Sequence, residues 1–267
     1  MKTVTSRDGT RIAYDQTGQG PAVILVAGAF SYRQYLGSVE LAELLSQHFA
    51  VINYDRRGRG DSGDTAPYAV EREIEDLEAL INAAGGSAYV WGLSSGAVLA
   101  LKAAACGLNI KKLVLHEPPF RVDNNGPLPP SDFIEQVTAL IDEGRRADAI
   151  KYFMTKGMGA PGIAMVFMRL MPGVWKRLMA VAHTLPYDAL LLKGYSAGKP
   201  LAASDWVAVT MPTLVLSGEK SAPALRNAAK AVADVLPNAK TRVLEGVSHT
   251  NVNMKIVAPA LEEFFNS

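Results

Sequence analysis

The chain has 267 residues, of which 49% are hydrophobic and 20% charged, so it can bury the core of one α/β domain with an insertion. Its net charge of +1 does not indicate a nucleic-acid partner. The single cysteine, Cys106, excludes an internal disulfide, and its alanine- and leucine-rich surroundings predict a buried thiol. The N-terminus lacks the apolar core of a signal peptide, and no run of about 18 apolar residues predicts a membrane span, so we expect a cytoplasmic protein.

Predicted strands and helices alternate along most of the chain. The apolar run 22–26 is typical of a central parallel strand buried on both faces. In chain order we expect strands 10–14 and 22–26, helix 39–48, strand 50–53, helix 70–84, strand 88–91, helix 97–106, strands 112–116 and 213–217, helix 224–236, strand 241–244 and helix 258–265. This alternation predicts right-handed βαβ units, and hence an α/β fold with a doubly wound, mostly parallel sheet.

Residues 120–208 interrupt this alternation, because no convincing strand occurs among them. Ser131 is a suitable N-cap for the first of their helical segments. The expected segments are 132–143, 146–156, 162–171, 174–183 and 188–195. We interpret the insertion as a helical cap, with residues 1–119 and 209–267 forming the core.

Residues 92–96 (Gly-Leu-Ser-Ser-Gly) follow the pattern G-x-S-x-G between a predicted strand and a predicted helix. This context is that of a nucleophile elbow, in which small residues allow a tight turn around an exposed serine. A helix that starts there directs free backbone N–H groups at an oxyanion. The motif therefore indicates that Ser94 is a nucleophile.

A serine nucleophile needs a base, and the chain has four histidines. His249 follows the last predicted strand, at the edge where ligands meet open α/β sheets, and we expect it to be the base. His48 is expected at the surface, and His183 lies in the insertion, where it is a candidate pocket residue. His116 ends a strand and is expected to pack or to support a catalytic side chain.

The turn at residues 92–96 and the loop 55–62 (Asp-Arg-Arg-Gly-Arg-Gly-Asp-Ser) together resemble the α/β-hydrolase fold superfamily. The order serine then histidine and the helical insertion agree with this resemblance, which covers nearly the whole chain. It implies a structural function for the 55–62 loop, with Arg59 and Asp61 solvated or bracing the loop. A serine in the turn argues against dehalogenases and epoxide hydrolases of this superfamily, which have aspartate there.

The resemblance implies a triad acid after the strand that follows the cap, but Ser221 occupies the position where the aspartate belongs. Glu117 is one alternative, because some members, including certain haloalkane dehalogenases, have a glutamate at the end of the preceding strand. Glu219 is a second alternative, the absence of a working acid is a third, and Glu245 is a weaker candidate. The sequence leaves these alternatives open.

The resemblance also implies an oxyanion hole after strand 22–26, where residues 27–30 read Ala-Gly-Ala-Phe instead of the usual His-Gly. Because the donors are backbone N–H groups, we assign them to Ala29 and Ser95; Phe30 is the next choice or forms the floor of the pocket. One such donor typically lowers the barrier by about 3 kcal/mol. No metal-ligand spacing, dinucleotide-binding glycine motif or P-loop occurs, so we expect neither metal nor cofactor.

Methionine and aromatic residues are frequent in the insertion. They either pack the cap onto the core or partly line an apolar pocket. The candidate pocket residues are Phe30, Met158, Met168, Trp175 and His183.

These features predict a serine hydrolase that cleaves a small hydrophobic carboxylic ester, thioester or lactone through an acyl-enzyme. The alternatives are a lyase or cofactor-free peroxidase of the same fold, and a non-catalytic receptor for a small ligand. The oligomeric state and the identity of the substrate are not predicted.

Overall fold

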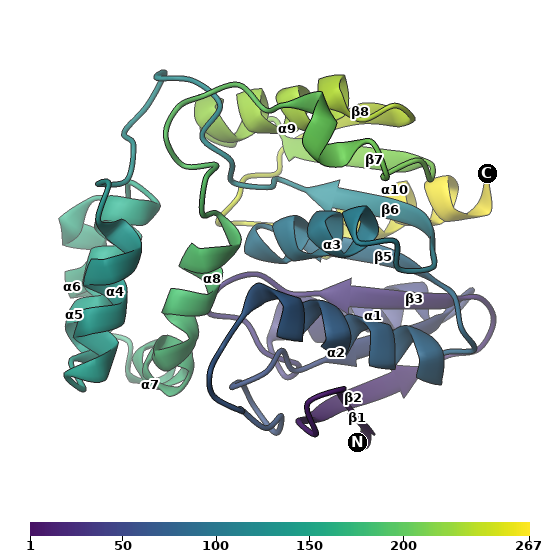
Figure 1. The fold of residues 1–267 in the computed structure, drawn as a ribbon, viewed down its shortest axis with the longest axis horizontal. Helices are drawn as coiled ribbons and strands as arrows, with labels where there is room; N and C mark the ends of the chain where they lie inside the picture. Colours follow the sequence, from purple (N-terminus) through teal and green to yellow (C-terminus); the bar gives the residue numbers. More distant parts are fainter.

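A computed structural model describes residues 1–267, with the exception of the side chain of Ala164. Its strands are β1 (Lys2–Thr5), β2 (Arg11–Thr17), β3 (Ala22–Val26), β4 (Ala50–Tyr54), β5 (Ala88–Leu93), β6 (Ile110–His116), β7 (Thr213–Gly218) and β8 (Ala239–Leu244). They form one sheet in the order β1-β2-β4-β3-β5-β6-β7-β8 (Figure 1). Pairing is antiparallel from β1 to β4 and parallel from β4 to β8, which confirms the predicted mostly parallel α/β sheet.

The strand order reverses at β3, which lies between β4 and β5. At such a switch point the loops after neighbouring strands diverge and leave room for a ligand at their carboxyl ends. The loops after β3, β5, β6 and β7 therefore meet at one edge of the sheet.

Helices cover both faces of the sheet. On one face, α1 (Leu36–Leu45) and α10 (Met254–Asn266) share an apolar cluster with residues of β3 and β4. On the other face, α2 (Val70–Ala83), α3 (Ser95–Ala105) and α9 (Pro223–Val235) contribute to a larger cluster. None of the helices in the described part of the chain is both long and apolar enough for a membrane crossing.

The segment between β6 and β7 contains helices and, within the described residues, no strand. Its helices are α4 (Phe133–Asp142), α5 (Arg146–Tyr152), α6 (Gly162–Arg169), α7 (Pro172–Val181) and α8 (Leu185–Leu191). They stand beside the carboxyl ends of the parallel strands, on the left of Figure 1. The buried apolar side chains of this segment form a cluster, which includes Phe133, Val137, Ile150, Phe153 and Leu185.

Several local expectations differ from the structure. Strand β1 was not expected, because in this exposed edge strand only Val4 is even partly buried. Helix α8 starts three residues before the expected 188, with Pro186 in its first turn, a position that proline favours. The prediction of a buried Cys106 was wrong: the residue follows the last turn of α3 and its thiol is exposed.

Candidate active site

Ser94 lies in a sharp turn between β5 and α3, with φ 56° and ψ −125°. A residue other than glycine in this region is strained and persists only where its surroundings impose it. The turn has no room for larger neighbours: a Cβ on Gly92 would lie 2.5 Å from the Gly96 carbonyl oxygen, and one on Gly96 2.2 Å from that of Val26. Both glycines of the motif are therefore required by close backbone packing.

Glu117 directly follows β6, the strand beside β5, and its side chain is fully buried. Its Oε2 lies 2.7 Å from Nδ1 of His249, and its Oε1 accepts a hydrogen bond of 2.7 Å from the Gly218 amide. Burial raises the pKa of Glu117, but His249, the nearby Ser221 hydroxyl and the Gly218 amide together hold it below its ordinary value. The carboxylate is therefore ionised at neutral pH and faces the imidazole.

The other carboxylates considered for this position lie elsewhere. Glu219 is exposed, and its Oε2 accepts a hydrogen bond of 3.0 Å from the Gly246 amide. Among the described residues, neither Glu219 nor Glu245 hydrogen-bonds to His249. Ser221, at the position expected for aspartate, is buried near Gly218.

The structure brings Ser94 and Glu117 to adjacent strand ends, and the Ser94 amide donates to the His116 carbonyl at 2.9 Å. His249 reaches the same edge on the loop after β8. Among the hydrogen bonds of the described side chains there is none between Ser94 Oγ and His249. The imidazole is thus oriented by Glu117 without being bonded to the serine.

The loop after β3 passes directly over Ser94. A Cβ on Gly28 would lie 3.0 Å from the Cβ of Ser94, so only glycine allows this approach. Ala29 follows in the loop, and Ser95 is the buried first residue of α3. The two residues assigned as oxyanion donors therefore flank Ser94.

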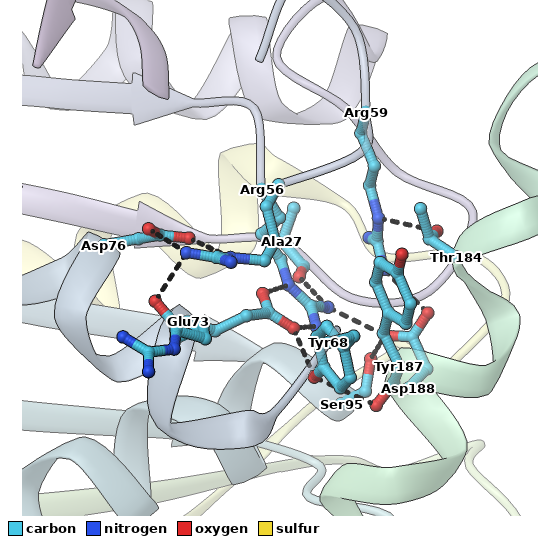
Figure 2. Close-up of polar contacts among 12 residues, drawn as sticks. Ala27, Arg56, Arg59, Tyr68, Glu73, Asp76, Ser95, Thr184, Tyr187 and Asp188 are labelled. Atoms are coloured by element: carbon cyan, nitrogen blue, oxygen red, sulfur yellow. Dashed lines mark hydrogen bonds and ion pairs between the residues drawn. The ribbon is translucent and has the colours of Figure 1, made fainter. Parts of the chain in front are cut away.

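Two buried arginines of the loop 55–62, Arg56 and Arg59, brace this region (Figure 2), whereas Arg57 joins the loop to α2. Arg56 makes two hydrogen bonds of 2.6 Å to Glu73, and Arg57 makes two of 2.8 Å to Asp76. Arg59 is 1% exposed and donates to the Gly28 carbonyl at 2.7 Å. The bracing function expected for Arg59 agrees with these contacts, whereas the alternative of a solvated side chain was wrong.

The candidate pocket residues lie in three different environments. Phe30 has a positive φ of 61°, packs edge-on against Phe153 at 5.7 Å and belongs with Met168 and Trp175 to the apolar cluster of the insertion. Met158 is 42% exposed. His183 is half-buried, and burial lowers its pKa, with the charge of Arg146 acting in the same direction.

Asp188 contacts the residue that follows Ser94, although no sequence motif indicated it. It is fully buried in α8 and hydrogen-bonds to Arg56, Arg59 and the Ser95 hydroxyl. A lone carboxylate within the apolar run 185–192 was an available signal, because a buried charge needs a partner of opposite charge. No cluster of three or more metal-binding side chains is found among the described residues.

His116 provides a prediction about stability. Its ring is fully buried, neither nitrogen has a hydrogen-bond partner among the described residues, and burial lowers its pKa from 6.5 to about 4. Between these values the unfolded chain binds a proton that the folded chain does not, so stability falls as the pH decreases from about 6.5 to about 4. The loss is about 3 kcal/mol. In urea unfolding measured against pH, His116→Leu should lack this part of the slope; an unchanged slope would contradict the assignment.

Residues 23–258 match the alpha/beta hydrolase family, and the chain belongs to this family. The chain is similar to the crystal structure of an alpha/beta hydrolase from Sphaerobacter thermophilus, with 50% identity and a TM-score of 0.90 over 99% of this chain and 100% of that one. It has the fold of an enol-lactonase from Burkholderia xenovorans (19% identity, TM-score 0.74, 100% of both chains). The same holds for a thermophilic esterase from Thermogutta terrifontis (23% identity, TM-score 0.69, 99% of this chain and 97% of that one). Family membership supports a hydrolase.

Proposed function

We propose that the protein is a serine hydrolase that cleaves small hydrophobic carboxylic esters, thioesters or lactones through an acyl-enzyme. The observation that carries this proposal is the hydrogen bond of 2.7 Å between the buried Glu117 carboxylate and Nδ1 of His249, beside the strained turn at Ser94. With Nδ1 held in this way, Nε2 of the imidazole is free to act as a base.

In the proposed reaction, Ser94 Oγ attacks the carbonyl carbon of the substrate while His249 Nε2 takes the hydroxyl proton. Glu117 stabilises the imidazolium that results. The N–H groups of Ala29 and Ser95 hydrogen-bond the oxygen as it becomes negative. His249 then gives its proton to the leaving alcohol or thiol, and the acyl group stays on Ser94.

Water then attacks the acyl-enzyme, with His249 again as base, and releases the carboxylic acid. The first proton transfer requires Ser94 Oγ and His249 to come within hydrogen-bond reach. Catalytic hydrogen bonds are often long or misaligned in the free enzyme and tighten in the substrate complex. We expect substrate binding to bring about this alignment.

We further propose that residues 120–208 act as a cap on a core formed by residues 1–119 and 209–267. Support comes from the apolar cluster of the insertion, against which Ala29 and Phe30 pack. Because Met168 and Trp175 belong to the same cluster, a substrate held between this cluster and Ser94 would meet mostly apolar side chains. The proposed preference for small hydrophobic substrates depends on this arrangement.

The proposal is tested with p-nitrophenyl esters of increasing chain length, a thioester and a small lactone. We expect kcat/KM to be highest for the short esters and activity to persist without added metal or cofactor. Lack of turnover with every substrate would contradict the proposal. Tight binding of a small hydrophobic ligand without turnover would favour the receptor, and turnover only with acetate and peroxide would favour the peroxidase.

A further inference from the structure

The carboxylate of Asp188 connects three parts of the chain that are distant in sequence (Figure 2). Its Oδ1 accepts hydrogen bonds from Arg56 Nη1 at 2.7 Å and from the Ser95 hydroxyl at 2.8 Å. Its Oδ2 accepts one from Arg59 Nη2 at 2.7 Å. One side chain of α8 therefore joins the helical insertion, the loop 55–62 and the first residue of α3.

The charges in this buried site balance. Arg56 and Arg59 face the carboxylates of Glu73 and Asp188, and all four side chains are almost completely buried. Burial raises the pKa of Asp188, but the charges of Arg59 and Arg56 outweigh this effect and hold it below its ordinary value. Removing the charge of Asp188 leaves one buried guanidinium without a counter-charge, so the arginines are expected to move.

Arg59 connects Asp188 to the loop after β3. Its Nη1 donates to the Gly28 carbonyl at 2.7 Å and to the Ser31 carbonyl at 3.2 Å. The Gly28 carbonyl and the Ala29 N–H belong to one trans peptide plane and point in opposite directions. The guanidinium therefore fixes the direction of the Ala29 N–H, and its charge polarises that amide.

Asp188 reaches the second proposed donor directly, through the hydroxyl of Ser95. The Ser94 carbonyl, which shares a peptide plane with the Ser95 N–H, accepts from the Ala97 amide at 2.9 Å within α3. The hydrogen bond within α3 therefore constrains the direction of the Ser95 N–H, and the contact of the hydroxyl with Asp188 adds a second constraint on the same residue.

We infer that Asp188 is a positioning residue for the oxyanion hole: through Arg59 it sets the direction of the Ala29 N–H group, and through the Ser95 hydroxyl it adds a second constraint on the residue that carries the other donor. This inference rests on the proposed function. If so, stabilisation of the transition state depends on how α8 packs against the core, because the carboxylate that positions the donor N–H groups belongs to the insertion. Loss of the carboxylate should therefore lower kcat rather than weaken substrate binding.

The test is Asp188→Asn, with Asp76→Asn as the matched control. Asp76 is also a buried carboxylate paired with an arginine, but none of the described hydrogen bonds of its partner Arg57 reaches Gly28 or Ser95. Both variants should have a lower Tm. At a temperature where both are folded by circular dichroism, Asp188→Asn should lower kcat for p-nitrophenyl acetate by about 10- to 100-fold, with KM within about threefold.

Affinity for a trifluoromethyl ketone, whose adduct with the serine carries an oxyanion, should fall by the same factor as kcat. Asp76→Asn should retain kcat and this affinity. If Asp188→Asn does not fold, Ser95→Ala removes only the hydroxyl contact and should lower kcat and ketone affinity together by about threefold or more. The inference would be overturned if folded Asp188→Asn kept the kcat of wild type, or if both aspartate variants lost kcat equally. Where Asp188→Asn does not fold, an unchanged kcat in Ser95→Ala would overturn it.

Wild type and Ser94→Ala are measured alongside these variants. If wild type shows no turnover that depends on Ser94, the proposed function has failed, and the inference fails with it. If wild type turns over and Asp188→Asn keeps its kcat, the inference alone has failed.

Discussion

Ser94→Ala is expected to lower kcat for short p-nitrophenyl esters by a factor of about 10⁴ to 10⁶. The substitution removes the proposed nucleophile without changing the tight turn, because Gly92, Gly96 and the strained φ of residue 94 are set by the surrounding backbone. The Ala29 and Ser95 N–H groups remain, so slow hydrolysis above the rate in water is expected to persist. Steady-state kinetics, with far-ultraviolet circular dichroism to verify folding, measure this effect.

The matched control is Ser46→Ala. The hydroxyl of Ser46 donates to the Glu43 carbonyl at the end of α1, just before β4 begins and hence at the edge of the sheet opposite the site. This variant should keep the kcat of wild type. Retention of more than about a tenth of wild-type kcat by Ser94→Ala would show that the hydroxyl is not the nucleophile.

Glu117→Gln is expected to lower kcat by a factor of about 10³ to 10⁴. The amide has nearly the same shape as the carboxylate but carries no charge, so it cannot stabilise the imidazolium of His249. The amide has only one acceptor oxygen, so its NH2 group faces either the Nδ1–H of His249 or the Gly218 amide, both of which are donors. The effect is measured as kcat near pH 8, well above the ordinary pKa of a carboxyl group.

Glu219→Gln separates the two glutamates considered for this function. Glu219 is exposed and contacts the Gly246 amide, so its substitution should leave kcat within about twofold of wild type. A loss in Glu219→Gln as large as that in Glu117→Gln would assign the acid to Glu219 instead. If neither variant loses activity, the protein works without an acid.

The alternation of strands and helices could be predicted because each buried element carries its own pattern. The run of residues 22–26 is apolar throughout, as a parallel strand buried on both faces must be, and it becomes β3. β1 gives no such signal, since as an exposed edge strand it needs little apolar surface. Strands in the centre of the sheet were therefore predictable, as was the edge strand β8, whereas the edge strand β1 was not.

The sequence allowed a contact between Glu117 and His249 to be proposed, but it could not distinguish Glu117 from Glu219 as the acid. Both residues follow strands, and the carboxyl ends of parallel strands meet at one edge of the sheet. Glu219 satisfies the same condition, so only the direction of each side chain separates the two. The buried carboxylate of Glu117, held by the Gly218 amide, faces the imidazole, whereas Glu219 points to the solvent-exposed amide of Gly246.

The partners of Asp188 could not be predicted from the sequence, for a different reason. Three arginines in the loop 55–62 suggest a solvated segment, because isolated arginines are seldom fully buried. Their burial depends on carboxylates contributed by α2 and α8, which the chain brings in from 17 to 132 residues away. Only the docking of the insertion onto the core reveals which carboxylate meets which arginine.

In the proposed site, Ser94 becomes nucleophilic because Glu117 holds His249 in position as its base. The most direct measurement is the site of covalent labelling by a fluorophosphonate, identified by peptide mapping with mass spectrometry in wild type and in His249→Gln. We expect a single adduct on Ser94 in wild type and labelling at least about a hundredfold slower in the histidine variant. No adduct, an adduct on another residue, or equal labelling rates in the two proteins would contradict the activation of Ser94 by His249.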